Sequence, residues 1–250
     1  MSNSINIVIR EQSGKHEIVK LLKTILWDLK FAARYNIITV AIVITILYTL
    51  IFKIIPVAAI TEVLITFIFS DPTMLGFIFI GAMVLFEKDA NTLQALLATP
   101  LKPWQYLWSK AISLTLIALL CSVGMAFIAK GFTFNLIHFI TSTALSSLLF
   151  AFIGFIGISR VRTFNQYILL IPMFLLPTIL PLADLYGLAR SPFFYLIPTH
   201  GSLILFKTAF EGESVWNIIY AYAILGISIA VTYRIAEKHY LTYISGKTKR

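Results

Sequence analysis

The chain has 250 residues, of which 59% are hydrophobic and only 12% are charged, and its formal net charge is +9. Soluble domains contain about 45–50% apolar and about 25% charged residues, so this composition excludes an ordinary soluble domain. The positive charge does not require nucleic acid as a partner, because basic residues gather on the cytoplasmic side of membrane proteins. We therefore predict an all-α, multi-pass protein of the lipid bilayer.

The first predicted helix covers residues 17–34 and is amphipathic. Apolar residues recur on it at i, i+3 and i+4 spacing, namely Ile18, Leu21, Leu22, Ile25, Leu26, Leu29 and Ala33. Basic residues and a tryptophan lie beside or away from that stripe, namely Lys20, Lys23, Trp27, Lys30 and Arg34. This pattern favours a helix in the plane of the membrane interface. The alternative is an ordinary cytoplasmic helix that packs on protein.

Six apolar segments predict spanning helices, at 35–53, 72–86, 111–129, 134–158, 165–182 and 214–233. The second is short for a bilayer. We place its start at Asp71 and Pro72, because aspartate caps helix N-termini and proline suits the first helical position. Residues 54–70 are then an outer-face loop with a short helix. In the fourth segment, Gly154 and Gly157 would permit close helix packing.

The fifth segment contains prolines at 172, 177 and 181, so we expect a kink or break in its outer half. Residues 183–213 form a long connection that is still apolar in places. We expect short helices there that re-enter the membrane or lie on the outer leaflet. The prolines that mark this predicted outer region are Pro177, Pro181, Pro192 and Pro198.

The charge distribution orients these segments. With six spans, sixteen of the twenty lysines and arginines lie on the side of the two termini, and four lie on the other side. The excess of positive charge marks the inner side. Both termini and residues 87–110 are therefore predicted to be cytoplasmic.

Residues 87–110 form a polar stretch between two apolar halves. Leu93, Leu96 and Leu97 make one apolar face on a helix of about two turns, which Pro100 and Pro103 end. An aromatic belt, Trp104, Tyr106 and Trp108, is expected where the next span enters the membrane. We interpret the stretch as a docking element for a protein outside the membrane.

Several catalytic and binding motifs are absent from the sequence, and their absence restricts the functions that we consider. We find no catalytic residues and no metal-ligand pattern. The run Gly246-Lys247-Thr248 is a chance match to a phosphate-binding loop, because position 241 is leucine and no strand precedes it. No ionisable residue falls near the centre of a predicted span, which argues against an ion-coupled carrier. Any nucleotide energy must then come from a partner.

Residues 87–110 resemble the inner loop of ABC-2 type transporter permeases. That loop has the sequence pattern E-x-x-x-x-T-L-x-x-L-x-x-T-P. Its matching residues here are Glu87, Thr92, Leu93, Leu96, Thr99 and Pro100, followed by Lys110. The segment FSDPTMLGFIFIGAMVLFEKD is similar to the fluoroquinolone-export-type subgroup of that family.

This resemblance implies a permease in a bacterial cytoplasmic membrane. Two permeases, the same or different, would pair, and each would dock a cytosolic ATPase that holds the ATP and Mg²⁺. The 87–110 loop would be the coupling helix, and the cargo would be hydrophobic or amphipathic, such as a drug, lipid or peptide. Two alternatives stay open, a non-transporting membrane scaffold or sensor, and an ion-coupled carrier.

Overall fold

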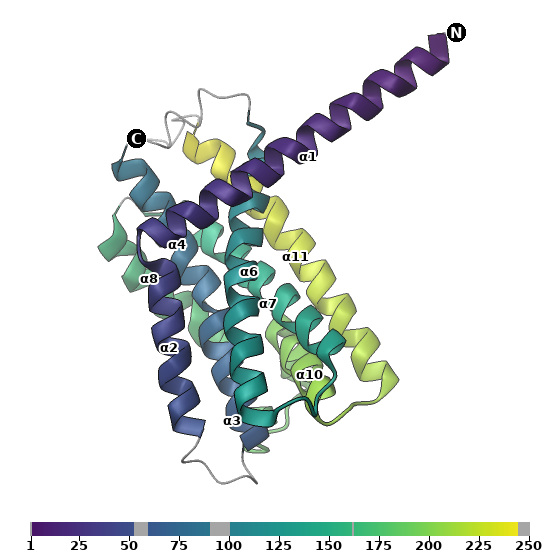
Figure 1. Ribbon diagram of the computed structural model, residues 1–250. Coiled ribbons are helices and arrows are strands. Elements are labelled where there is room, and N and C mark those ends of the chain that lie inside the picture. Colours follow the sequence, from purple (N-terminus) through teal and green to yellow (C-terminus); the bar gives the residue numbers. More distant parts are fainter. Residues whose placement is uncertain (1, 53–59, 91–100, 162, 245–250) are drawn as a thin grey trace.

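The computed structural model describes residues 2–52, 60–90, 101–161 and 163–244, and all regular structure in these ranges is helical (Figure 1). The elements are α1 (Ser2–Arg34), α2 (Ile37–Phe52), α3 (Ile60–Ile68), η2 (Phe69–Thr73), α4 (Leu75–Asp89), α6 (Pro103–Lys130), α7 (Leu136–Ile158), α8 (Phe164–Ile179), α9 (Leu182–Leu185), η3 (Pro192–Leu196), α10 (Pro198–Phe210) and α11 (Val215–Ile244). The all-α prediction is confirmed for these residues.

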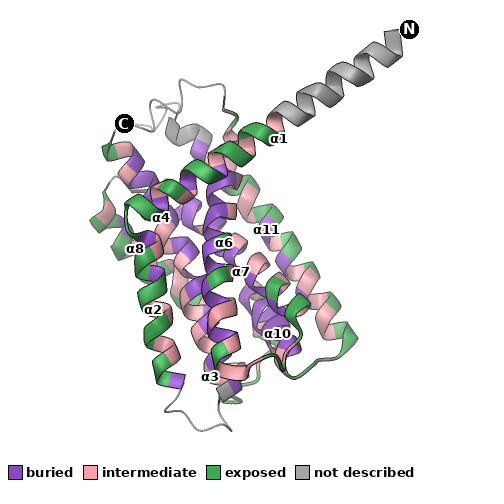
Figure 2. Ribbon diagram, in the orientation of Figure 1, coloured by how far each residue is buried: buried purple, intermediate pink, exposed green. Residues whose placement is uncertain are grey.

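Helix α7 lies at the centre of the bundle and packs against α4, α6, α10 and α11. Its aromatic residues Phe139, Phe150 and Phe152 are fully buried. Helices α2 and α11 carry many exposed residues, whereas α6 and α7 are largely buried (Figure 2). Large apolar side chains such as Ile46 and Trp216 are among the exposed ones. An apolar outer surface of this kind is suited to contact with lipid.

Within the described ranges, four helical segments are long and apolar enough to cross a membrane. They are Thr61–Asp89, Pro103–Lys130, Leu136–Ile158 and Val215–Tyr240. Helix α1 from Glu17 and helix α2 together would make a fifth, but they meet at a bend of 67°. Asn36 at this bend has φ 59°, a left-handed conformation that asparagine tolerates. Because of this bend, α1 crosses the end of the bundle whereas α2 runs along the bundle.

The expected six-span layout is therefore supported only in part. Helix α2 stands where the first span was predicted and α8 where the fifth was predicted, but each has 16 residues. Helix α8 contains Pro172 and Pro177 within its length. The last helix continues to Ile244, eleven residues beyond its predicted end.

The predicted start of the second span is wrong. Asp71 does not cap a helix, and Pro72 does not begin one. Both lie inside the π-helical turn η2, which joins α3 to α4. The hydroxyl of Thr73 donates a hydrogen bond of 2.5 Å to the carbonyl of Ile68, five residues earlier, which is the spacing of a π turn. Much of the supposed outer loop is thus part of one long helical segment.

Residues 183–213 contain the short helices that we predicted, α9, η3 and α10. Helix α10 is mostly buried and packs against α7 and α11. Lys207 in its last turn forms an ion pair of 3.1 Å with Glu213, and Asn217 donates a hydrogen bond of 3.1 Å to Glu213. Partial burial would raise the pKa of Glu213, but these hydrogen bonds outweigh it and hold the pKa below its ordinary value.

Close packing at Gly154 is confirmed and joins α7 to α4. A Cβ atom added at Gly154 would lie 2.9 Å from the carbonyl oxygen of Phe77 and 3.1 Å from its Cα. The hydroxyl of Tyr167 on α8 donates a hydrogen bond of 2.5 Å to the same carbonyl. The backbone of Phe77 is therefore held between two helices, and it has little freedom to move away from a larger side chain.

The replacement Gly154→Ala is expected to destabilise the protein by about 1–3 kcal/mol, because the new methyl group meets backbone atoms. Gly124→Ala on α6 is the matched control, since nothing lies within 4 Å of a Cβ atom there. The midpoint of thermal unfolding in detergent should fall for the first variant and stay equal or rise slightly for the second. Equal midpoints for Gly154→Ala and the parent would contradict the packing described.

Candidate functional site

Helix α1 crosses the bundle at one end (Figure 1). There, charged side chains connect α1, α4 and α6. Lys110 on α6 is fully buried, with 0% of its surface exposed. Asp28 on α1 and Glu87 near the end of α4 are 5% and 3% exposed. We call Asp28, Glu87 and Lys110, with Tyr106 and Ser109, the ion cluster.

Lys110 bridges the two carboxylates. Its Nζ donates a hydrogen bond of 2.8 Å to Oδ1 of Asp28, and it donates another to Oε1 of Glu87. Both contacts are also ion pairs. The ammonium group lies 4.8 Å from the centre of the Tyr106 ring, close enough for a cation–π interaction. One cation thus connects α1 to α4 through α6.

Two hydroxyl groups complete the hydrogen bonding of the carboxylates. Tyr106 donates to Oε2 of Glu87 at 2.8 Å, and Ser109 donates to Oδ2 of Asp28 at 2.7 Å. Each of the four carboxylate oxygens therefore accepts a hydrogen bond. A buried ion pair is tolerated only when its remaining lone pairs are satisfied in this way. The cluster meets that requirement despite its excess of one negative charge.

Helical periodicity on α1 and α6 explains how the sequence builds this cluster. Asp28 shares a buried face of α1 with Ile25 and Ala32, at i−3 and i+4. On α6, Tyr106, Ser109 and Lys110 follow one another at i, i+3 and i+4, so that Ser109 and Lys110 reach Asp28 on α1 while Tyr106 reaches Glu87 on α4. These two faces bring the charges into contact along the line where the helices cross.

Further contacts fasten α1 to the start of α6. Lys102 and Glu17 form an ion pair, and the side chain of Gln105 donates a hydrogen bond of 3.3 Å to the carbonyl of Glu17. Gln105 also accepts a hydrogen bond of 3.0 Å from the Lys102 backbone, within the capping box that begins α6 at Pro103. The first turn of α6 is thus fixed on α1.

A fourth helix, α11, also contacts the ion cluster. The ring of Tyr240 on α11 stacks on Tyr106 with 4.7 Å between centroids. Tyr106 was expected in an aromatic belt at the membrane surface, and that expectation is wrong. It is 2% exposed, because its hydroxyl bonds Glu87 inside the bundle. The neighbouring Trp108 is partly buried and packs against Phe152 and Tyr233.

The predicted docking segment flanks this cluster. Glu87 lies close to the end of α4, and Lys110 lies in the second turn of α6, so the chain between these helices leaves from the cluster and returns to it. Of the residues proposed to contact an ATPase, only Glu87 is described. The others, Thr92, Leu93, Leu96, Leu97, Thr99 and Pro100, lie outside the described residues.

The residues predicted for the interfacial helix lie away from the cluster. All five are exposed on α1, namely Lys20, Lys23, Trp27, Lys30 and Arg34. The predicted apolar stripe is divided, because Ile25 is buried while Ile18, Leu22 and Leu26 are exposed. Helix α1 therefore packs on the rest of the protein with one narrow face. On its other faces, apolar and basic side chains are exposed.

The prolines of the predicted outer region occupy separate elements. Pro177 lies in α8 and is exposed, whereas Pro181 precedes α9 and is buried. Pro192 and Pro198 begin η3 and α10. They mark element boundaries and do not form one cluster.

Sequence reasoning missed Asp28 and Lys110 as members of a site. For Asp28 the available signal was its spacing from Ile25 and Ala32, which places it on the buried face of α1. Lys110 entered only as the residue that follows the loop motif. Among the described residues, no group of three potential metal ligands comes together. The ion pairs of Lys110 with Asp28 and Glu87 connect α1, α4 and α6.

Comparison with known proteins identifies relatives. The model of the fluoroquinolones export permease protein family matches residues 19–248. Two curated proteins from Mycobacterium tuberculosis, strains CDC 1551 / Oshkosh and H37Rv, are each named a fluoroquinolones export permease protein. Each is 33% identical over 156 residues, which cover 61% of this chain and 65% of the relative.

Replacing Lys110 by alanine should leave two carboxylates buried without their cation. We expect Lys110→Ala to lower the free energy of unfolding by about 3–5 kcal/mol, the usual cost of breaking a buried ion pair from one side. The control is a triple variant without charges, Lys110→Met with Asp28→Asn and Glu87→Gln, which should be less destabilised. Thermal unfolding followed by tryptophan fluorescence compares them. A triple variant that is less stable than Lys110→Ala would contradict this account.

Proposed function

The chain belongs to the fluoroquinolones export permease protein family, and from that membership we propose that it is the membrane-spanning permease subunit of an ABC-2 type exporter. The family is one of transport permeases and not of enzymes. In this proposal a separate cytosolic ATPase subunit binds and hydrolyses ATP, and a second permease, the same or different, completes the transporter. The cargo is a hydrophobic or amphipathic molecule, and fluoroquinolones are the candidates that the relatives' names suggest.

The ion cluster is the observation that carries the proposal. It joins both helices that flank residues 91–100 to each other and to α1. A force applied to this segment by a partner would therefore displace α4, α6 and α1 together. A permease that receives its energy from a separate protein needs such a rigid connection between its docking surface and its spanning helices.

The docking surface would be residues 87–110, acting as a coupling helix. Leu93, Leu96 and Leu97 would insert as an apolar face into a groove of the ATPase. Glu87 would have a different role at the base of the second span, because its carboxylate is held inside the ion cluster. Helix α1, with its exposed basic residues and Trp27, would lie in the inner membrane interface and move with the ATPase.

The orientation follows from charge. In the six-span arrangement the end that carries α1 and the ion cluster faces the cytoplasm, together with both termini, because sixteen of twenty basic residues lie on that side. The elements α9, η3 and α10 then belong to the outer side, where they would form the outer gate. Cargo would pass between the two permeases and leave past these short helices.

An ion-coupled carrier is the second candidate, and one observation favours it. Asp71 lies inside the continuous helical segment Thr61–Asp89, not at its outer end. Intramembrane carboxylates are costly and often serve proton or ion transport. Efflux of cargo that persists without ATP but stops when the proton gradient is dissipated would favour this candidate over an ATP-driven exporter.

The docking role is tested with the double variant Leu96→Asp and Leu97→Asp. Losing two buried leucine contacts should weaken the complex with the ATPase by more than about tenfold. Co-purification of the ATPase with the tagged permease from native membranes measures this. Gln94→Asp is the control, since it adds charge to the same segment outside the leucine face. An undiminished complex, with cargo still stimulating ATP hydrolysis, would defeat the docking role.

The transmission role of the ion cluster is tested with the same uncharged triple variant of Asp28, Glu87 and Lys110. It should still bind the ATPase, because the docking segment is unchanged. ATP-dependent uptake of a fluoroquinolone into inverted vesicles, which corresponds to export from the cell, should fall by at least about fivefold, as expected when a coupling free energy of 1–3 kcal/mol is lost. Full uptake by vesicles with a folded, ATPase-bound triple variant would show that the cluster only stabilises the fold.

A further inference from the structure

Asp71 is a partly buried acidic side chain in another part of the bundle from the ion cluster. It lies in the π-helical turn η2, in the middle part of the helical segment Thr61–Asp89. Pro72 has no N–H group to donate, and the hydroxyl of Thr73 satisfies the carbonyl of Ile68. The local backbone is therefore adapted to an irregular turn, and such turns are frequent at functional sites.

The carboxylate of Asp71 lacks the partners that Asp28 and Glu87 have. In the part of the chain that the structure describes, its Oδ2 is buried and has no hydrogen-bond partner. Nor does any described lysine, arginine or histidine form an ion pair with it. Burying a carboxylate oxygen without a partner is costly, so a cation from outside the chain would be bound favourably there.

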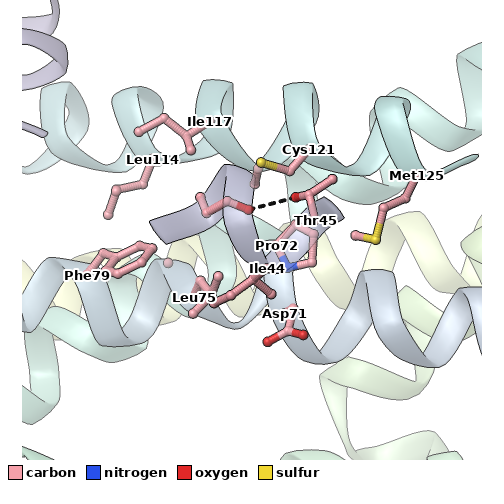
Figure 3. A pocket seen from close by; sticks show the side chains of 13 residues that line it. Ile44, Thr45, Asp71, Pro72, Leu75, Phe79, Leu114, Ile117, Cys121 and Met125 are labelled. Atoms are coloured by element: carbon pink, nitrogen blue, oxygen red, sulfur yellow. Dashed lines mark hydrogen bonds between the residues drawn. The ribbon is translucent and has the colours of Figure 1, made fainter. Parts of the chain in front are cut away.

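The surroundings of Asp71 define what kind of cation fits. It lines a narrow space between α2, η2, α4 and α6, together with apolar side chains that include Ile44, Leu75 and Leu114 (Figure 3). Thr45 and Cys121 are its weakly polar members. A lining with one full charge and little other polarity disfavours a hydrated metal ion and favours a charged group carried on an apolar body.

A larger apolar groove adjoins this space. It runs along α2 and α6, reaches Ile140 on α7, and shares Thr45, Ile117 and Cys121 with the space beside Asp71. The smaller space has a cavity volume of about 10 Å³ and the larger one of about 700 Å³. The smaller one admits a group of about the size of one water molecule, such as an ammonium group, and the larger one suits the body of a drug-sized molecule.

We propose that Asp71 binds the protonated amine of an amphipathic cation, whose apolar body lies in the groove between α2 and α6. This inference deepens the proposed function and rests on it, since it makes the groove part of the cargo path. The charge of Asp71 selects the cargo, and the apolar lining tolerates variation in the rest of the molecule.

The test uses dansylcadaverine, an amphipathic primary amine, and its N-acetylated analogue, which has the same body but no charge. At pH 7 the free amine is protonated, because aliphatic amines have a pKa of about 10.4. The full chain in lipid nanodiscs, without any ATPase, is titrated with each compound. Cys121, the single cysteine of the chain, reports occupancy through its rate of alkylation by N-ethylmaleimide.

The amine should protect Cys121 at about tenfold lower concentration than the acetylated analogue, which corresponds to about 1.4 kcal/mol. Asp71→Asn should remove this preference, and Asp71→Glu should retain it. The comparison of the two compounds on the unaltered protein stands even where a variant does not fold.

Three outcomes would overturn the proposal: equal protection by both compounds, a preference that survives Asp71→Asn, or no protection by either. Equal protection would indicate an apolar groove without charge selection. Absence of protection would mean that lipid or a second permease occupies the groove. Because no ATP is involved, these results are independent of whether ATP-driven export itself is found.

Discussion

The burial of Lys110 between Asp28 and Glu87 is the constraint on which the arrangement of this protein depends. A lysine without solvent contact is stable only where acceptors surround it, and here these come from two other helices. Helix α1 must therefore cross the bundle where it brings Asp28 to α6, and α4 must end where Glu87 reaches the same ammonium group. The charged contact fixes the relative positions of three helices at the end where a partner would act.

Asp71, an acid that is only partly buried, shows the opposite arrangement. The carboxylates of the ion cluster accept hydrogen bonds at every oxygen, whereas one oxygen of Asp71 has no partner among the described residues. A fully satisfied cluster holds helices together, and an unsatisfied carboxylate in an apolar space attracts a ligand. In the function proposed here, the ion cluster would transmit force from the partner and Asp71 would contact the cargo.

Particular elements show how far sequence reasoning reached. The length of the apolar segments predicted α6, α7 and α11, because a continuous apolar run of about 20 residues is typical of a spanning helix. Glu87 was identified through its motif, yet its partners were not, since Asp28 and Lys110 lie 59 and 23 residues from it along the chain. The pair Asp71-Pro72 carries a strong local signal for a helix start. It was misleading, because packing of η2 against α6 and α7 stabilises a π turn there.

The sequence by itself determined that this is an all-helical membrane protein, where most of its long helices run, and which family it belongs to. These properties follow from apolar length, charge asymmetry and local motifs, all of which are written along the chain. Only the tertiary structure decided that Lys110 is shared by two carboxylates, that Tyr106 faces inward, and that Asp71 lies within a helix. Those facts depend on contacts between helices distant in sequence, and periodicity alone does not specify which faces meet.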